Sequence, residues 1–178
     1  MLRKLGTKDM KKTTPLKFIT RTAILAALTI VFQMIGLPQM VTGPIVNMLL
    51  LTATVMVGAA SGAVVGLITP FIALQMGILK PVMAPMMPWI AISNVLLCIT
   101  FAVVLGLISR KENVVTKIIA CIPAAFVKFF VLSAVVRWIV DLPAPAAAMM
   151  QGTQLVTALI GGVAAAVFTE LLIKLGVK

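Results

Sequence analysis

The sequence contains no histidine and no tyrosine, and only four of its 178 residues are acidic. Without histidine there is no imidazole for general acid–base catalysis, for metal ligation or for a Ser-His-Asp triad. The acids, Asp9, Glu112, Asp141 and Glu170, are scattered and form no pair in the sequence. No GxxxxGK(S/T) string occurs, so the chain has no P-loop with which to hydrolyse ATP. We therefore predict no enzymatic activity, no metal site and no cofactor.

Charge of either sign is scarce, because charged residues make up 11% of the chain and hydrophobic residues 62%. Soluble domains average about 25% charged residues. So little polar surface cannot cover a water-soluble globule, and we predict an integral membrane protein. The two cysteines, Cys98 and Cys121, lie within apolar runs and are predicted to be small core residues.

Twelve of the 15 Lys and Arg residues, which give the chain its net charge of +11, lie at the flanks of the apolar segments. Seven of the 15 Lys and Arg residues fall within residues 3–21, and smaller groups follow at Arg110, Lys111 and Lys117 and at Lys174 and Lys178. This distribution is typical of solvated cytoplasmic flanks that obey the positive-inside rule, and it argues against a nucleic-acid partner. The basic tail also resembles that of a signal peptide, but no small-x-small cleavage site follows Ile35, so we predict a retained first helix.

Apolar runs long enough to span a membrane, about 20 residues, predict helices at 18–37, 85–109, 115–140 and 150–175. The run 44–79 is interrupted at 58–62 and is read as two short helices, because an even number of crossings keeps the basic group at 110–117 in the cytoplasm. The prediction is an all-α membrane protein with six transmembrane helices and both termini cytoplasmic. A basic tail, 1–17, precedes one substrate-binding domain, 18–175.

Small residues four apart predict where these helices approach closely. Two sets have this spacing, namely Gly58, Gly62 and Gly66 in the third helix and Ala158, Gly162 and Ala166 in the sixth. Packing within the chain is the simpler interpretation of both.

Six amide side chains lie in the predicted outer half of the membrane: Gln33, Asn47, Gln75, Asn94, Gln151 and Gln154. An amide left without a partner in hydrocarbon costs several kcal/mol, so these groups must face one another, water or a ligand. Each amide taken singly fits a helix–helix contact, but six in one half favour an outward-facing pocket. Gln151 and Gln154, three residues apart, are expected to share a helix face.

Lys128 lies near the middle of the fifth predicted helix. A lysine at a helix centre costs about 2.5–3.5 kcal/mol on insertion scales, and no acidic residue is evident at the same depth. We interpret Lys128 as a pocket cation that awaits a substrate with a carboxylate or another hydrogen-bond acceptor. Arg137, nine residues further on, lies roughly on the opposite helix face and is either an interfacial anchor or a second pocket residue. Trp89 is either an interfacial residue or a stacking wall, and the proline-rich loop 141–145 could serve as a lid.

Together these features resemble the S component, the substrate-binding membrane subunit of energy-coupling factor (ECF) transporters for vitamins. The likeness rests on the basic N-terminus, six helices, Ala23-x-x-x-Ala27, and the stretches 42–47 (TGPIVN) and 88–94 (PWIAISN). It implies a subunit of the cytoplasmic membrane that binds a vitamin-like substrate near the extracellular face. It also implies that Ala23 and Ala27 dock on a coupling membrane subunit, and that two ATP-binding-cassette ATPase subunits drive this partner. The resemblance further implies that the S component topples in the membrane to deliver its substrate.

Two other functions remain open at this point. The glycine faces are compatible with a small oligomeric channel or facilitator, and amides that act only in helix packing are compatible with a membrane assembly factor. No motif in the sequence identifies the vitamin.

Overall fold

The computed structural model of the protein describes residues 15–108 and 113–177. The predicted basic residues Arg3, Lys4, Lys8, Lys11, Lys12, Arg110, Lys111 and Lys178, and with them most of the predicted tail 1–17, lie outside the described residues. The long helices are α1 (Pro15–Met34), α2 (Gln39–Met56), α3 (Ala59–Gln75), α4 (Met87–Ile108), α5 (Val114–Trp138) and α7 (Gly152–Lys174). Two short helices lie between them, the 3₁₀ helix η1 (Pro81–Met86) and α6 (Ala144–Met149).

The predicted division of the run 44–79 into two helices is confirmed. Gly58 lies between α2 and α3 with φ +133°, a backbone conformation essentially reserved for glycine. Its N–H donates a hydrogen bond to the carbonyl of Ala53. Within residues 15–108 and 113–177, five segments are long and apolar enough to span a membrane, and α3 is a shorter apolar helix. The predicted start of α2 at Pro44 is wrong, because the helix begins at Gln39, directly after Pro38, and takes Pro44 into its second turn.

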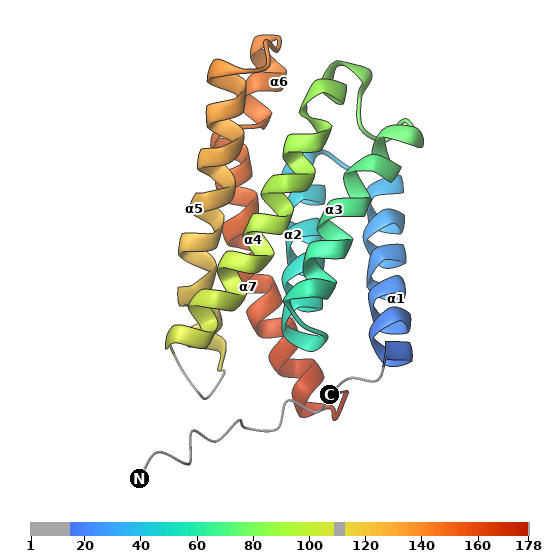
Figure 1. Cartoon of the computed structure of the whole chain (residues 1–178), viewed down its shortest axis with the longest axis vertical. Helices are drawn as coiled ribbons and strands as arrows, with labels where there is room; N and C mark the ends of the chain where they lie inside the picture. The colour runs from blue at the N-terminus through green and yellow to red at the C-terminus, as the bar shows by residue number, and fades with distance from the viewer. Residues whose placement is uncertain (1–14, 109–112, 178) are drawn as a thin grey trace.

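The long helices run along the long axis of the molecule as a bundle (Figure 1). The beginning of α1 and the end of α7 lie at the same end, as an even number of crossings requires (Figure 1). The α1–α2 connection, η1 and α6 lie at the other end. The predicted loop after Asp141 is therefore partly helical, since α6 starts at Ala144.

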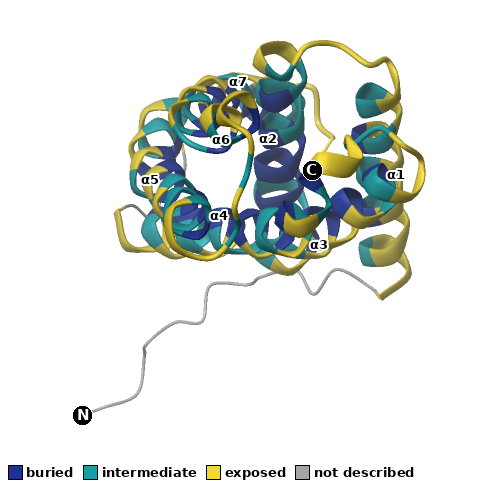
Figure 2. Cartoon of the chain, turned by 90° about the horizontal axis from the view of Figure 1, so that it is seen from above, coloured by how far each residue is buried: buried dark blue, intermediate teal, exposed yellow. Residues whose placement is uncertain are grey.

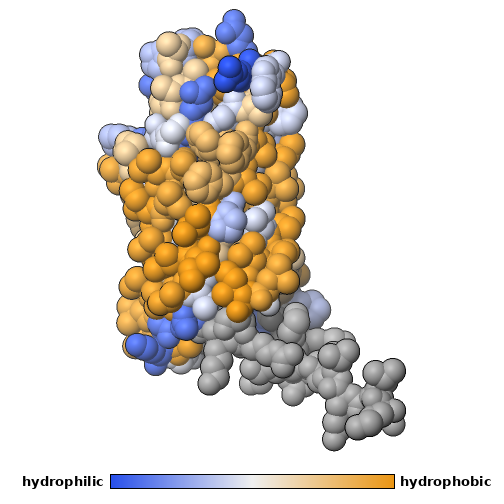
Figure 3. All heavy atoms as spheres, turned by 90° about the vertical axis from the view of Figure 1, so that its left-hand side faces the viewer, coloured by the Kyte–Doolittle hydropathy of each residue, from blue (hydrophilic) through white to orange (hydrophobic). Residues whose placement is uncertain are grey.

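The burial pattern separates a central helix from a peripheral one (Figure 2). Helix α2 is largely enclosed, and its Leu50 and Leu51 belong to the main core together with Phe101. Helix α1 stands at the edge of the bundle, with Thr22 and Thr29 as its buried residues. The face of the molecule drawn in Figure 3 carries a broad hydrophobic belt between two more hydrophilic ends, as expected of a multi-pass membrane protein.

Most of the predicted small residues bring the helices into contact within the chain, but Gly58 does not, since a Cβ added there would have no described atom within 4 Å. A Cβ added at Gly66 would lie 2.9 Å from the Cβ of Asn94, and one added at Gly162 would collide with Cys121. Both cysteines are buried free thiols in the core. Because these glycine faces are filled by helices of the same chain, they are not available as faces of an oligomer.

Lys117 departs from the prediction of a solvated cytoplasmic flank. Its side chain is completely buried, and its ammonium donates hydrogen bonds to Glu170 Oε2 at 3.3 Å and to Thr169 Oγ1 at 3.2 Å. Asn113 caps α5, so Lys117 lies one turn inside the helix on the side that faces α7. The expectation of a solvated lysine was wrong because the sequence does not reveal that Glu170, 53 positions away, lies opposite.

Candidate functional site

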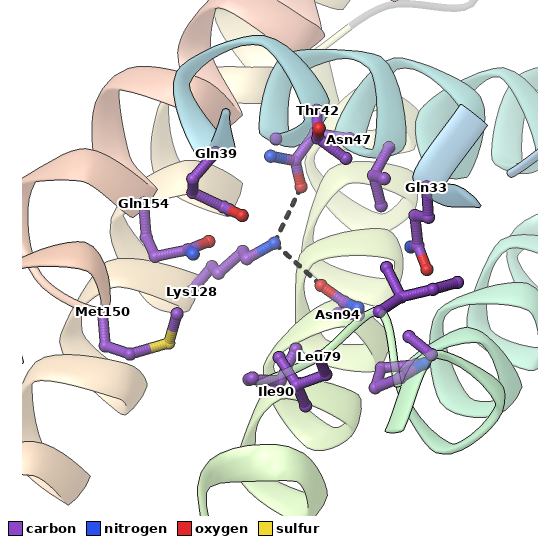
Figure 4. Close-up of a pocket in the computed structure, with 15 residues that line it drawn as sticks. Gln33, Gln39, Thr42, Asn47, Leu79, Ile90, Asn94, Lys128, Met150 and Gln154 are labelled. Atoms are coloured by element: carbon purple, nitrogen blue, oxygen red, sulfur yellow. Dashed lines mark hydrogen bonds between the residues drawn. The ribbon is translucent and has the colours of Figure 1, made fainter. Parts of the chain in front are cut away.

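A cavity of about 130 Å³ lies among the six long helices, toward the end of the bundle opposite the start of α1 and the end of α7, since its lining includes Gln33 near the end of α1 and Gln154 near the start of α7. Every long helix contributes to its wall (Figure 4). Its polar lining comes from Gln33, Gln39, Thr42, Asn47, Asn94, Lys128 and Gln154. Its other lining residues are Gly43, Val46, Pro70, Ala73, Ile78, Leu79, Ile90 and Met150.

Lys128 is the central cation of this cavity. Its side chain is only 3% exposed, and its ammonium donates to Asn47 Oδ1 and to Asn94 Oδ1, each at 2.8 Å (Figure 4). A lysine ammonium has three N–H donors, and the described residues accept from two of them. No acidic residue is among the described residues that line the cavity. The ammonium of Lys128 is therefore hydrogen-bonded to neutral amides, and no carboxylate of the described lining neutralises its charge.

Close helix contacts hold the two asparagines in place. Asn94 Nδ2 donates to the carbonyl of Gly66 at 3.2 Å, which turns its Oδ1 toward Lys128. The absence of a side chain at Gly66 lets α4 approach α3, and Gly161 does the same for α7 beside Asn47. The sequence thus places three polar groups from α2, α4 and α5 at one point.

Two glutamines, Gln154 and Gln33, also line the cavity that holds Lys128. Gln154 is 4% exposed, and its Nε2 donates to the carbonyl of Met149 at 3.3 Å. Gln33, on α1, has a buried Oε1 that has no hydrogen-bond partner among the described residues. Such an atom is costly unless water or a ligand donates to it.

The model of one protein family, described as "ECF transporter, substrate-specific component", matches residues 17–173, nearly the whole chain. The chain belongs to this family. This match confirms the assignment as an S component that the sequence suggested by resemblance. It also confirms that the chain is a multi-pass protein of the cell membrane with a role in transport. Comparison with curated proteins and with solved structures gives no significant match.

Four residues that the sequence placed in the site lie outside the cavity lining of this S component. Gln75 is exposed, because it lies two positions after the lining residue Ala73 and so points to another side of α3. Gln151 does not share a helix face with Gln154, since its backbone angles, φ −108° and ψ −114°, are not helical. Arg137 is exposed at the end of α5.

Trp89, the fourth of these residues, is half-buried and packs against a second apolar cluster that includes Met83, Met86 and Leu132. It follows η1 at the start of α4, about five positions before Asn94, and this spacing turns it away from the side chain of Asn94. Trp89 therefore supports the end of the bundle beside the cavity.

Sequence reasoning missed Gln39 and Thr42, which line the cavity from the first turn of α2. Pro38 was the available signal, because proline is common where a helix begins. A helix begun there would have placed Gln39 and Thr42, three residues apart, near one helix face. No sequence signal pointed to Leu79 or Met150, which reach the cavity from connecting segments.

Proposed function

We propose that this S component captures a vitamin or related micronutrient at the extracellular face for ATP-driven uptake by partner subunits. The observation that carries the proposal is the buried Lys128. Its third N–H has no acceptor among the described residues, and the described lining of the cavity includes no acidic residue. A mid-membrane lysine costs about 2.5–3.5 kcal/mol, and two neutral amides compensate for it only in part. A solute that accepts the third hydrogen bond completes the solvation of the ammonium.

The position of the basic residues supports an extracellular opening. Lys17 and Arg21 lie at the start of α1, and Lys174 lies in the last turn of α7, at the end of the bundle opposite the cavity. By the positive-inside rule that end faces the cytoplasm. The cavity then lies in the outer half of the membrane.

Helix α1 supports the proposed docking of the coupling membrane subunit and its two ATPase subunits. Ala23 and Ala27 are exposed on α1, and their small side chains permit close approach of another helix. We expect Ala23→Trp and Ala27→Trp to abolish ATP-driven uptake and to leave solute affinity unchanged. Val103→Trp, on the exposed face of α4, is the matched control and should keep both properties. Unimpaired uptake in both alanine variants would refute this docking surface.

Native mass spectrometry of gently purified protein tests the binding function. We expect one small organic solute per chain, lost or weakened at least tenfold in Lys128→Met. Arg137→Met, which removes an exposed cation outside the cavity, should retain the solute. Flux or conductance in liposomes without ATP and without partners would instead identify a channel. Absence of any bound solute would favour an assembly factor.

A further inference from the structure

We propose that the cavity recognises a small acid at two ends, with an anionic group at Lys128 and a hydrogen-bond donor at Gln33. This inference rests on the proposed solute-binding function and specifies its substrate class. Three observations carry it. No described residue of the lining neutralises the charge of Lys128, none donates a hydrogen bond to Gln33 Oε1, and the cavity has the volume of a small molecule.

The charge of the cavity favours an anion over a neutral solute. Lys128 is the one cationic residue in the described lining, and no carboxylate faces it there. Both asparagines present their oxygen atoms to the ammonium, so they stabilise its charge without removing it. A carboxylate that accepts the remaining N–H forms a charge-assisted hydrogen bond in a poorly solvated site, where such bonds are strongest.

Gln33 supplies the second point of recognition. Gln33 lines the cavity wall contributed by α1, and its Oε1 is buried and has no partner in the described part of the chain. In Figure 4 the Gln33 side chain lies on one side of Asn94 and Lys128 on the other. A solute with a hydroxyl or N–H group distant from its acid group can donate to this oxygen. Leu79 and Ile90 offer apolar surface to the part between the two groups.

The volume limits the solute to a small molecule. A cavity of about 150 Å³ binds benzene, and the cavity here has about 130 Å³. The cavity is therefore of the size that holds one six-membered ring or an aliphatic acid of similar size. Solutes that carry several fused rings exceed it.

Matched small acids and amides test the proposal on the full chain in lipid nanodiscs. The probes are benzoate, 3-hydroxybenzoate and 4-hydroxybenzoate, each compared with its primary amide, and binding is measured by intrinsic tryptophan fluorescence and by the shift in melting temperature. We expect each acid to bind at least tenfold more tightly than its amide. We expect the better-fitting hydroxy acid to bind about three- to tenfold more tightly than benzoate, the range for one added hydrogen bond.

Four variants assign these preferences to residues. Lys128→Met should abolish the preference for acids, and Asn94→Asp should do the same with Lys128 retained, because it provides an internal anion at unchanged side-chain size. Gln33→Met should abolish the gain from the hydroxyl group and keep the preference for acids. Gln75→Met, an exposed glutamine outside the cavity, is its matched control and should behave as the parent protein.

Equal binding of acids and amides, or no binding of any acid at millimolar concentration, overturns the proposal. So does a gain from the hydroxyl group that persists in Gln33→Met. A neutral or cationic solute that co-purifies in native mass spectrometry would also overturn it, and would leave the proposed solute-binding function intact. If no solute co-purifies and no probe binds, both fail.

Discussion

Replacing Gly161 with alanine is expected to weaken the packing of α7 on α2 beside the cavity. A Cβ at this position would lie 2.6 Å from the carbonyl oxygen of Pro44, 2.7 Å from the Cβ of Asn47 and 3.0 Å from the backbone nitrogen of Met48. Carbon atoms in contact are normally separated by about 3.5–4.0 Å, so the helices must separate. Two of the three obstructing atoms belong to the backbone and cannot move aside as a side chain can.

The magnitude follows from two opposing effects. Overpacking costs about 1–3 kcal/mol, whereas alanine in place of glycine stabilises a helix by about 0.5–1 kcal/mol. The difference between these effects is about 0–2.5 kcal/mol, and because two backbone atoms obstruct the new Cβ we expect the free energy of unfolding to fall by an amount in the upper half of this range, about 1–2.5 kcal/mol. Because Asn47 is displaced, solute binding mediated by Lys128 should weaken as well.

The assay is reversible unfolding by sodium dodecyl sulfate in mild detergent, followed by far-UV circular dichroism. Gly106→Ala is the matched control, since Gly106 is an exposed helical glycine of α4 with no atom within 4 Å of an added Cβ. It should be neutral or stabilising by up to about 1 kcal/mol. If Gly161→Ala is as stable as the parent or as Gly106→Ala, the argument for a close α2–α7 contact is wrong.

Three further predictions concern other parts of the bundle. Glu170→Ala should destabilise the protein by about 2–3 kcal/mol in the same assay, because it leaves the buried ammonium of Lys117 without its anion. The double variant Glu170→Ala/Lys117→Met should recover most of that loss, and a double variant no more stable than Glu170→Ala would argue against the ion pair. Gly58→Ala should cost about 1–3 kcal/mol, since alanine rarely adopts φ +133°, and unchanged stability would show that this turn is not required. Cys98 and Cys121 are 0% and 1% exposed, so a membrane-permeable maleimide should label neither in the folded protein and both after unfolding; rapid labelling under native conditions would contradict their burial.

Much of the site was predictable because burial of polar groups in a membrane is costly wherever it occurs. Lys128, Asn47, Asn94, Gln33 and Gln154 were selected on that ground alone, and all five line the cavity. The variants of Lys128, Asn94 and Gln33 test whether these side chains bind a solute.

The failures share a different cause, since the direction of a side chain depends on exact helix boundaries. Gln151 was assigned to a helix face, but α7 begins one residue later, and the backbone of Gln151 is not helical. Gln39 was missed because α2 was started at Pro44 instead of after Pro38. Gln75 and Arg137 lie at helix ends, where a small change of angle separates a pocket residue from an exposed one.

The sequence by itself determined that this is a membrane protein of six helices, because apolar length and the position of basic charges report directly on the lipid environment. It also determined that Lys128 requires partners. The tertiary structure alone decided which partners these are, since Asn47 and Asn94 lie 81 and 34 positions away and meet the lysine only when glycines let the helices pack closely. In the same way, only the packed bundle converts Lys117 from a predicted solvated flank into a buried ion pair.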